Sequence, residues 1–317
     1  MISQKEFIAQ AFPKMKIRHK ILRRLFEYAS RIKLLLLPPI RIKDSQSIRN
    51  FTFLMIFNKK NFIYTKATLY SFLKNSNDLP QNIILISDGS WELEEGKQYF
   101  SFLQGFNVTY ESYQDSIEYF KSKQENELAQ WAQKHIWGKK YASIVRHAAQ
   151  DLVLFSDPDV LWYKSPFKDG DFASNEILKL SIDNSHNYDD KLIEILGIDT
   201  LYNETPINCG IVLMKGKSES FHCINGIKEA LKYESKVAGP FAEQTIFAIE
   251  YLKYKEVWNE TEISASISDM LQPYFKLNKY PSGFIARHYL FILKWIYWVT
   301  ILFSALTRMF PKPTFAP

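Results

Sequence analysis

From residue 51 onward, short apolar runs alternate with longer segments whose composition favours helices. Strand-like runs lie at residues 51–57, 82–87 and 108–110, and helical segments follow the first two runs at residues 64–73 and 91–103. Parallel strands must be joined by a long crossover, which is usually a helix. This alternation therefore predicts an α/β fold, with a mostly parallel central sheet and helices on both of its faces.

The second half of the chain continues this pattern with less regular spacing. Residues 116–149 are expected to be helical and polar, and residues 151–155, 176–182 and 210–214 have the composition of strands. Pro240 is suited to the first turn of a further helix. In open α/β sheets ligands bind at the carboxyl ends of the strands, so polar residues that directly follow these runs are the candidates for chemistry.

Basic residues are concentrated near the N-terminus. Residues 14–43 contain ten Lys or Arg and one acid, Glu27, which gives this segment a net charge of +9. The whole chain carries +6 and residues 1–13 balance, so residues 44–317 sum to −3. A nucleic-acid-binding body needs a basic face of its own, so we expect no nucleic-acid partner.

The same basic segment has the periodicity of an amphipathic helix. Apolar side chains recur at helical spacing from Ile17 to Ile32, and Pro38 and Pro39 end the pattern, which predicts a helix over about residues 14–36. Two interpretations stay open. The helix lies on an anionic membrane surface, or it packs on the body of the protein with its basic face in solvent.

A second unusual segment lies near the C-terminus. Residues 289–306 are almost wholly apolar, but Lys294 interrupts them and leaves a charge-free stretch of 12 residues. A membrane-spanning helix needs roughly 20 apolar residues, so we expect a buried or interfacial helix. Residues 14–43 and 289–306 are the candidate contacts with an anionic membrane surface.

We expect the chain to comprise three parts, a basic helical extension over residues 1–49, a central α/β domain over residues 50–290, and an apolar aromatic helix and tail over residues 291–317. Two cysteines without a C-x-x-C pair favour a reducing compartment. The first residues lack the apolar core of a signal peptide. The expected location is the cytoplasm, or a peripheral position on the inner face of the membrane.

Ser156, Asp157, Pro158 and Asp159 follow directly on the apolar run at residues 151–155. Two carboxylates on either side of a proline can converge on one cation, and hard cations such as Mg²⁺ and Mn²⁺ prefer oxygen ligands. Such an ion stabilises the negative charge that develops on a diphosphate leaving group. The same residues are also ordinary turn formers, so the acid pair alone does not identify a site.

The surroundings of this acid pair are more specific. Residues 152–166 read LVLFSDPDVLWYKSP, which resembles the D-x-D region of GT-A nucleotide-sugar glycosyltransferases, in particular glycosyltransferase family 8 and the related nucleotide-diphospho-sugar transferases. Further similarities follow in the family's order over about residues 50–297. They are a first strand, nucleotide loop and helix at residues 53–73, a second strand ending in Asp88, a basic helix entry at Lys139 and Lys140, a small-residue strand at Asn208, Cys209 and Gly210, the pair Glu243 and Gln244, and a late His288 and Tyr289 followed by Lys294.

This resemblance implies a GT-A fold and a metal-dependent glycosyltransferase. The reaction would move a hexose from a nucleotide sugar, a UDP-sugar in most of the related families, to a glycan or lipid-linked acceptor. The family-8 likeness implies retention of the anomeric configuration. However, the sequence identifies no side chain as a nucleophile or base, so the residues alone leave the stereochemistry of the reaction open.

The resemblance also assigns roles to individual residues. The expected ligands of Mn²⁺ or Mg²⁺ are Asp157, Asp159 and His288. Contacts with the reacting sugar or the acceptor are expected from Asn208, Glu243 and Gln244. Contacts with the nucleotide and its phosphates are expected from six residues, Asn58, Asp88, Lys139, Lys140, Asp157 and Lys294.

Two other classes of function stay open. The family's glycine between the histidine and the lysine is absent here, as is the proline after the lysine, so a module that binds sugar nucleotide without turnover is one alternative. The other is a haloacid-dehalogenase-like phosphohydrolase, in which D-x-D also follows an apolar strand. In that case Asp157 would be the nucleophile, with Asp189 and Asp190 as an accessory acid pair.

Overall fold

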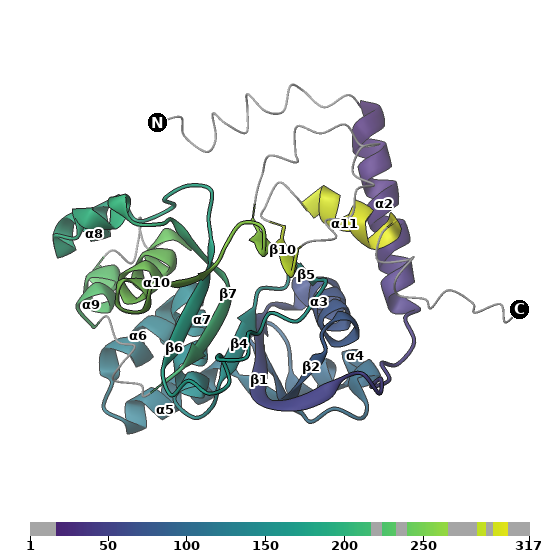
Figure 1. Ribbon diagram of the computed structural model, residues 1–317, viewed down its shortest axis with the longest axis horizontal. Coiled ribbons are helices and arrows are strands. Elements are labelled where there is room, and N and C mark those ends of the chain that lie inside the picture. Colours follow the sequence, from purple (N-terminus) through teal and green to yellow (C-terminus); the bar gives the residue numbers. More distant parts are fainter. Residues whose placement is uncertain (1–16, 217–223, 233–239, 266–283, 290–293, 304–317) are drawn as a thin grey trace, which may run out of the picture.

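Seven strands form a central sheet in the order β3-β2-β1-β4-β7-β6-β8 (Figure 1). The computed structural model describes residues 17–216, 224–232, 240–265, 284–289 and 294–303. All neighbouring strands of this sheet are parallel except at β7, which is antiparallel to both β4 and β6. The predicted mostly parallel sheet is therefore confirmed. Its strands are β1 (Ser47–Phe57), β2 (Asp78–Ser87), β3 (Val108–Ser112), β4 (Val153–Ser156), β6 (Ile177–Ile182), β7 (Ile207–Lys215) and β8 (Glu256–Trp258).

Side chains alternate between two hydrophobic cores along the strands. In β1, Phe53 and Met55 lie in one core, and Leu54 and Ile56 lie in the other. Since successive strand residues point to opposite faces, each core covers one face of the sheet. The first core includes residues of α2 (Ile17–Leu35), α3 (Phe62–Asn75), α4 (Leu93–Tyr99) and α11 (Lys294–Phe303), and the second includes residues of α5 (Tyr113–Ser122), α6 (Asn126–Lys134), α7 (Ile136–Ala148), α8 (Asp190–Leu196), α9 (Ile224–Lys232) and α10 (Pro240–Tyr254).

Residues 116–149 differ from the single helical segment expected from sequence. The chain breaks between α5 and α6 at Gln124, whose φ of 61° is left-handed, and between α6 and α7 at His135, which is extended. Three shorter helices result, and they can pack across one another on the sheet. The expected loop after β1 contains a 3₁₀ turn, η1 (Lys59–Asn61), and two further 3₁₀ turns are η2 (Ser101–Leu103) and η3 (Asp199–Asn203).

A second, three-stranded sheet stands at the carboxyl end of β4. It has the order β5-β10-β9, from β5 (Val160–Trp162), β9 (Ile263–Ser264) and β10 (Ala286–His288). The strand β5 follows β4 after only three residues, so the chain passes from the large sheet into the small one through Asp157, Pro158 and Asp159. The small sheet therefore brings β10, from the far end of the chain, next to this turn.

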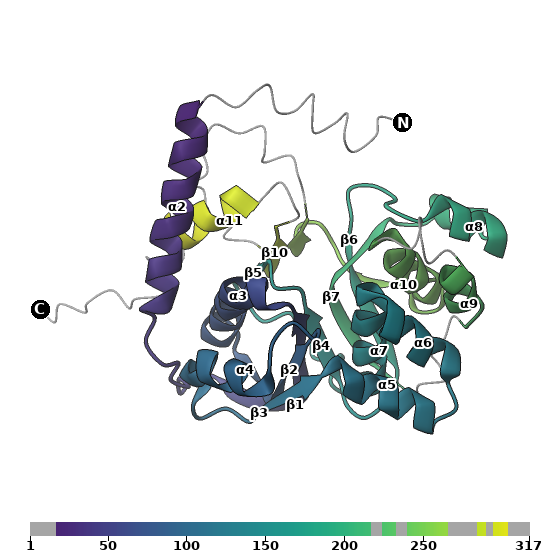
Figure 2. The same ribbon diagram turned by 180° about the vertical axis from the view of Figure 1, so that it is seen from behind.

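The N-terminal and C-terminal helices pack on each other. In Figures 1 and 2, α11 lies against α2 beside α3. Ser30 is fully buried and donates a hydrogen bond to the Trp298 carbonyl at 2.8 Å, and the Arg31 guanidinium lies 5.3 Å from the Trp298 ring centroid. One face of α2 thus packs on the body of the protein. Among the described helices, none is both long and apolar enough to cross a membrane.

Two adjacent leucines test this packing. Leu34 is 1% exposed and belongs to the first core, whereas Leu35 is 59% exposed. We expect Leu34→Ala to lower the free energy of unfolding by about 2–4 kcal/mol, because it leaves a cavity under α2. Leu35→Ala should change it by less than about 0.5 kcal/mol. Urea unfolding of both variants measures the difference, and equal values would show that α2 does not pack as described.

Candidate functional site

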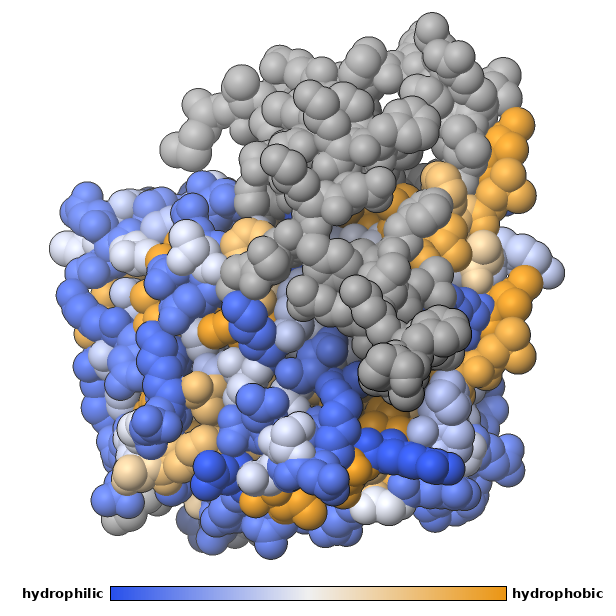
Figure 3. Space-filling view, turned by 45° about the vertical axis from the view of Figure 1, so that its right-hand side comes forward, coloured by the Kyte–Doolittle hydropathy of each residue, from blue (hydrophilic) through white to orange (hydrophobic). Residues whose placement is uncertain are grey.

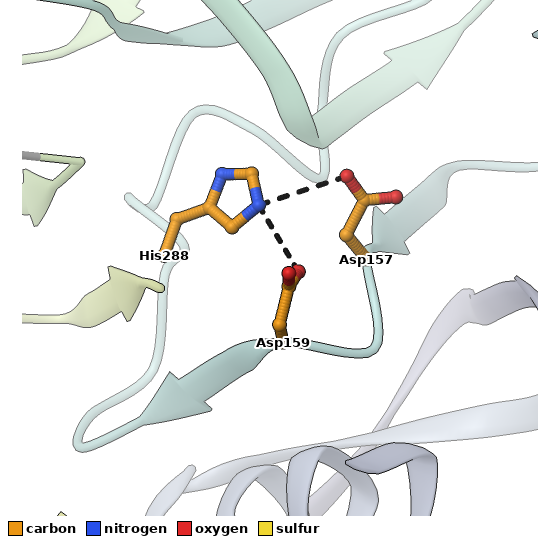
Figure 4. Close-up of side chains that lie close together, drawn as sticks. All are labelled: Asp157, Asp159 and His288. Carbon is orange, nitrogen blue, oxygen red and sulfur yellow. Dashed lines mark hydrogen bonds and ion pairs between the residues drawn. The ribbon is translucent and has the colours of Figure 1, made fainter. Parts of the chain in front are cut away.

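Asp157, Asp159 and His288 meet at the junction of the two sheets. One ligand atom from each of the three residues lies within 4.8 Å of the others. His288 Nε2 is 3.1 Å from Asp159 Oδ1 and 3.7 Å from Asp157 Oδ2, and Figure 4 shows this nitrogen pointing at both carboxylates. The structure therefore brings together the three residues that the sequence predicted as metal ligands.

Strand pairing explains how residues so far apart in sequence meet. In the register of the small sheet, His288 of β10 lies opposite Val160 of β5. Val160 is the residue that directly follows Asp159 in the sequence. The Tyr289 amide donates to the Asp159 carbonyl at 2.9 Å, and the Asp157 amide donates to the Gly210 carbonyl at 2.7 Å. The backbone of both acids is therefore held by neighbouring strands.

Side chains of the α3 helix hydrogen-bond the backbone of the same turn and of β5. Thr68 Oγ1 lies 2.6 Å from the Pro158 carbonyl oxygen and 2.8 Å from that of Val160, and Ser71 Oγ accepts from the Trp162 amide at 3.0 Å. Trp162 is fully buried beside the turn. Sequence reasoning missed Thr68 and Ser71, because a hydroxyl on the buried face of a helix gives no signal of which backbone it contacts.

Asn208 determines the orientation of the His288 ring. Asn208 Oδ1 accepts a hydrogen bond from the Gly210 amide at 2.9 Å and lies 3.0 Å from His288 Nδ1. Because this oxygen can only accept, His288 Nδ1 must carry a proton. In a neutral His288 the lone pair is then on Nε2, facing two carboxylates. That arrangement needs a proton or a metal ion between the ring nitrogen and the carboxylates.

The charges of the site agree with this conclusion. Burial raises the pKa of Asp157 above its ordinary value, although Lys140 and His288 oppose the effect. Burial lowers the pKa of His288, but Asp159 and Asp157 outweigh it and raise the pKa overall. Each shift favours the protonated form, through burial for Asp157 and through the two neighbouring acids for His288. Two carboxylates and an imidazole nitrogen are suitable ligands for Mn²⁺ or Mg²⁺, and neighbouring ligands of such an ion are about 3 Å apart.

Lys140 is buried between two acids. Its Nζ is 3.3 Å from Asp157 Oδ1 and 3.2 Å from Glu243 Oε1. Burial alone would lower the pKa of Lys140, but the charges of Asp157, Cys209 and Glu243 raise it above its ordinary value. Burial raises the pKa of Glu243 to about 7. Lys140 therefore joins Asp157, at the end of β4, to Glu243 in the first turn of α10.

Lys139, although adjacent in sequence, points elsewhere. Its Nζ donates to the Asp88 carbonyl at 2.7 Å and lies 3.6 Å from the Tyr113 ring centroid. Asp88 follows β2, and Asn58 follows β1, where its side chain accepts from the Asn61 amide. Asn58, Asp88 and Asp157 thus follow three neighbouring parallel strands and lie at the same edge of the sheet.

A carboxylate that sequence reasoning missed gathers the amides of the site. Asp183 Oδ2 accepts from Gln244 Nε2 at 3.1 Å, from Asn187 Nδ2 at 3.2 Å and from Asn208 Nδ2 at 3.3 Å. Asp183 directly follows β6 and is buried. Its position after a predicted strand is the signal that could have identified it. Lys294 begins α11, but its side chain lies outside the described residues.

Gly210 gives a direct test of the His288 position. A Cβ atom at Gly210 would come closer than 3.0 Å to three atoms of the His288 ring, whereas a Cβ at Gly170 would meet nothing within 4 Å. We expect Gly210→Ala to displace the ring and abolish stabilisation of the fold by Mn²⁺. Gly170→Ala should keep wild-type stabilisation. Thermal unfolding with and without Mn²⁺ compares the variants, and normal Mn²⁺ stabilisation of Gly210→Ala would contradict this packing.

The different environments of the two lysines predict different costs. Lys140→Met removes the cation that pairs with the partly exposed Asp157 and the buried Glu243, and we expect a loss of about 3 kcal/mol in the free energy of unfolding. Lys139→Met removes a half-buried contact with a carbonyl and should cost about 1 kcal/mol. Denaturant unfolding at neutral pH measures both. A smaller loss for Lys140→Met than for Lys139→Met would refute the buried ion pairs.

Comparison with known proteins places this geometry in a known fold. No protein-family model and no curated protein matches the sequence. Solved structures do match. The apo crystal structure of mouse xyloside xylosyltransferase 1 has a TM-score of 0.50 at 12% identity, over 76% of this chain and 97% of that chain. The galactosyltransferase LgtC, in complex with donor and acceptor sugar analogues, has a TM-score of 0.49 at 15% identity, over 76% and 87% of the two chains.

This chain therefore shares its fold with a solved sugar transferase. Membership of family 8 in particular stays a prediction. The chain has the GT-A fold of nucleotide-sugar glycosyltransferases, as the sequence predicted.

Proposed function

We propose that this chain is a metal-dependent glycosyltransferase that moves a hexose from a UDP-sugar to a glycan or lipid-linked acceptor. The observation that supports it best is the cluster of Asp157, Asp159 and His288 at the carboxyl end of β4 in a GT-A fold. These three side chains would hold Mn²⁺ or Mg²⁺. The bound ion would neutralise charge on the diphosphate leaving group.

The donor nucleotide is proposed to lie along the edge formed by the ends of β1, β2 and β4. Asn58 and Asp88 are at this edge, and Lys139 approaches it from α7. Lys140 is less suited to the proposed phosphate contact, because its ammonium group is already paired with Asp157 and Glu243. Its proposed role becomes that of a positioning residue for Asp157. Lys294 remains a proposed phosphate contact.

The reacting sugar is proposed to lie beside Gln244, Asn208 and Glu243. Asp183 holds the amides of Gln244 and Asn208, which limits their rotation. Asn208 also orients His288, so its main proposed role is positioning. Glu243, with a pKa of about 7, would orient the acceptor or stabilise positive charge at the anomeric carbon. Retention of configuration is proposed from the family-8 resemblance.

The phosphohydrolase alternative has less support. It would use Asp189 and Asp190 as an acid pair beside Asp157. Asp189 instead caps α8 by accepting from the Lys191 and Leu192 amides, and Asp190 accepts a hydrogen bond from Tyr202. Both acids thus have structural roles at the start of α8.

The location proposed for the transferase is the cytoplasmic side of a membrane, where a lipid-linked acceptor would be available.

The central test is metal-dependent stabilisation by nucleotide sugars. We expect UDP-sugars with Mn²⁺ to stabilise the wild-type fold by about 2.7 kcal/mol at a hundredfold excess over Kd, because they bind only the folded state. Asp159→Asn, which keeps the side-chain shape, should lose most of this gain. Asp169→Asn, a change at an exposed acid, should keep it. Thermal unfolding across a panel of UDP-sugars measures the effect.

Activity assays with the same UDP-sugars and with simple phosphate esters separate the alternatives. Release of UDP that depends on Asp159 supports the transferase. Stabilisation without any UDP release would support a binding module instead. Hydrolysis of simple phosphate esters that depends on Asp157 would support the phosphohydrolase. If no nucleotide sugar shifts the unfolding temperature, the proposed function is wrong.

A further inference from the structure

We propose that the outward side of α2 is a docking surface for an anionic lipid membrane. This outer face consists of Ile21, Leu25, Tyr28, Ile32, Leu35 and Leu36, all of them exposed. Successive members are four, three, four and three residues apart up to Leu35, which places them in one row along the helix. Of the exposed large hydrophobic side chains in the described part of the chain, most lie between Ile21 and Ile42.

Single exposed apolar side chains are ordinary on a soluble protein, but a continuous row marks an interaction site. Figure 3 shows hydrophobic side chains gathered on the side where α2 comes forward, while much of the remaining visible surface is hydrophilic. The opposite side of the helix is already used, because Ser30, Leu34 and Leu37 are buried against the body. The outer face is therefore available for a contact other than packing on the described part of this chain.

Charge identifies the occupant. Residues 14–43 carry a net charge of +9, and Arg24, Arg41 and Lys43 are exposed on or just after α2. The one acid of this segment, Glu27, is paired with Arg31 at 2.8 Å. A second copy of the chain would bring the same positive charge to the contact. An anionic lipid surface supplies both the apolar layer for the row and the opposite charge for the basic residues.

The contacts of α2 connect this surface to the candidate site. Ser30 holds the Trp298 carbonyl of α11, and within α11 Thr300 Oγ1 accepts from Tyr289 Oη at 3.1 Å. The Tyr289 amide in turn donates to the Asp159 carbonyl. A docked α2 would therefore keep the site at a constant height above the lipid. This makes a lipid-linked acceptor the favoured class, a conclusion that rests on the proposed transferase function.

Sedimentation of the full chain with lipid vesicles tests the docking surface. We expect binding to vesicles that contain phosphatidylglycerol, weaker binding to pure phosphatidylcholine, and a decrease at high salt. The double variant Leu25→Gln, Ile32→Gln should bind about tenfold more weakly, because two apolar side chains no longer enter the lipid. The control Ile136→Gln, Ile195→Gln changes two other exposed apolar residues, on α7 and α8, and should bind as wild type.

Several outcomes would overturn the proposal. Equal vesicle binding of the two double variants would exclude the outer face as the contact. If the wild type forms a dimer and does not bind vesicles, while the α2 variant is a monomer, the occupant of the outer face is a second copy of the chain. Stabilisation by UDP-sugars, measured without vesicles, should be unchanged in the α2 variant. This measurement also separates the two hypotheses, because a wild type that UDP-sugars stabilise but that does not bind anionic vesicles refutes docking and leaves the transferase function standing.

Discussion

Two carboxylates and an imidazole nitrogen can share one small volume only if positive charge lies among them. Asp157 and Asp159 both face His288 Nε2, and Asn208 requires the proton of a neutral ring to be on the other nitrogen. Lys140 supplies a permanent cation on one side of Asp157. The remaining negative charge is balanced by a proton, on His288 or on one of the two carboxyl groups, or by a bound ion. The packing of β4, β5, β7 and β10 around this point serves to hold acids together that would otherwise repel one another.

The parts of this site that sequence predicted are those that depend on local order. Asp88, Asp157 and Asn58 each follow an apolar strand, and the ends of neighbouring parallel strands must meet at one edge. The α/β alternation determined the fold class for the same reason. His288 is different, because nothing local marks a histidine on a three-residue strand as a ligand. Its prediction came from the ordered resemblance to glycosyltransferases, and the structure supplies the physical reason in the pairing of β10 with β5.

The parts that sequence could not predict depend on which way a side chain points. Lys139 and Lys140 are neighbours of the same type, yet one contacts the Asp88 carbonyl and the other is buried between two acids. Helical geometry separates adjacent side chains by about 100°, but only the tertiary packing decides which one faces the core. Asp183 follows a predicted strand, but its contacts could not be predicted, since Asn187 of the next loop, Asn208 of β7 and Gln244 of α10 meet it only in the folded chain. Gly210 is a further example, because a larger side chain there would collide with the ring of His288, which is 78 residues away in the sequence.

The helices α2 and α11 belong to the same structural unit as the site. Tyr289 follows His288 directly, and it hydrogen-bonds both the Asp159 backbone and Thr300 of α11. The α11 helix then packs on α2 through Trp298, so the basic N-terminal helix supports the strand that carries the third candidate ligand. A helix that merely tethered the protein would not need this contact, because a flexible linker would serve equally well. Direct packing instead gives a continuous chain of contacts from Ser30 of α2 through α11 to Tyr289, the residue next to His288.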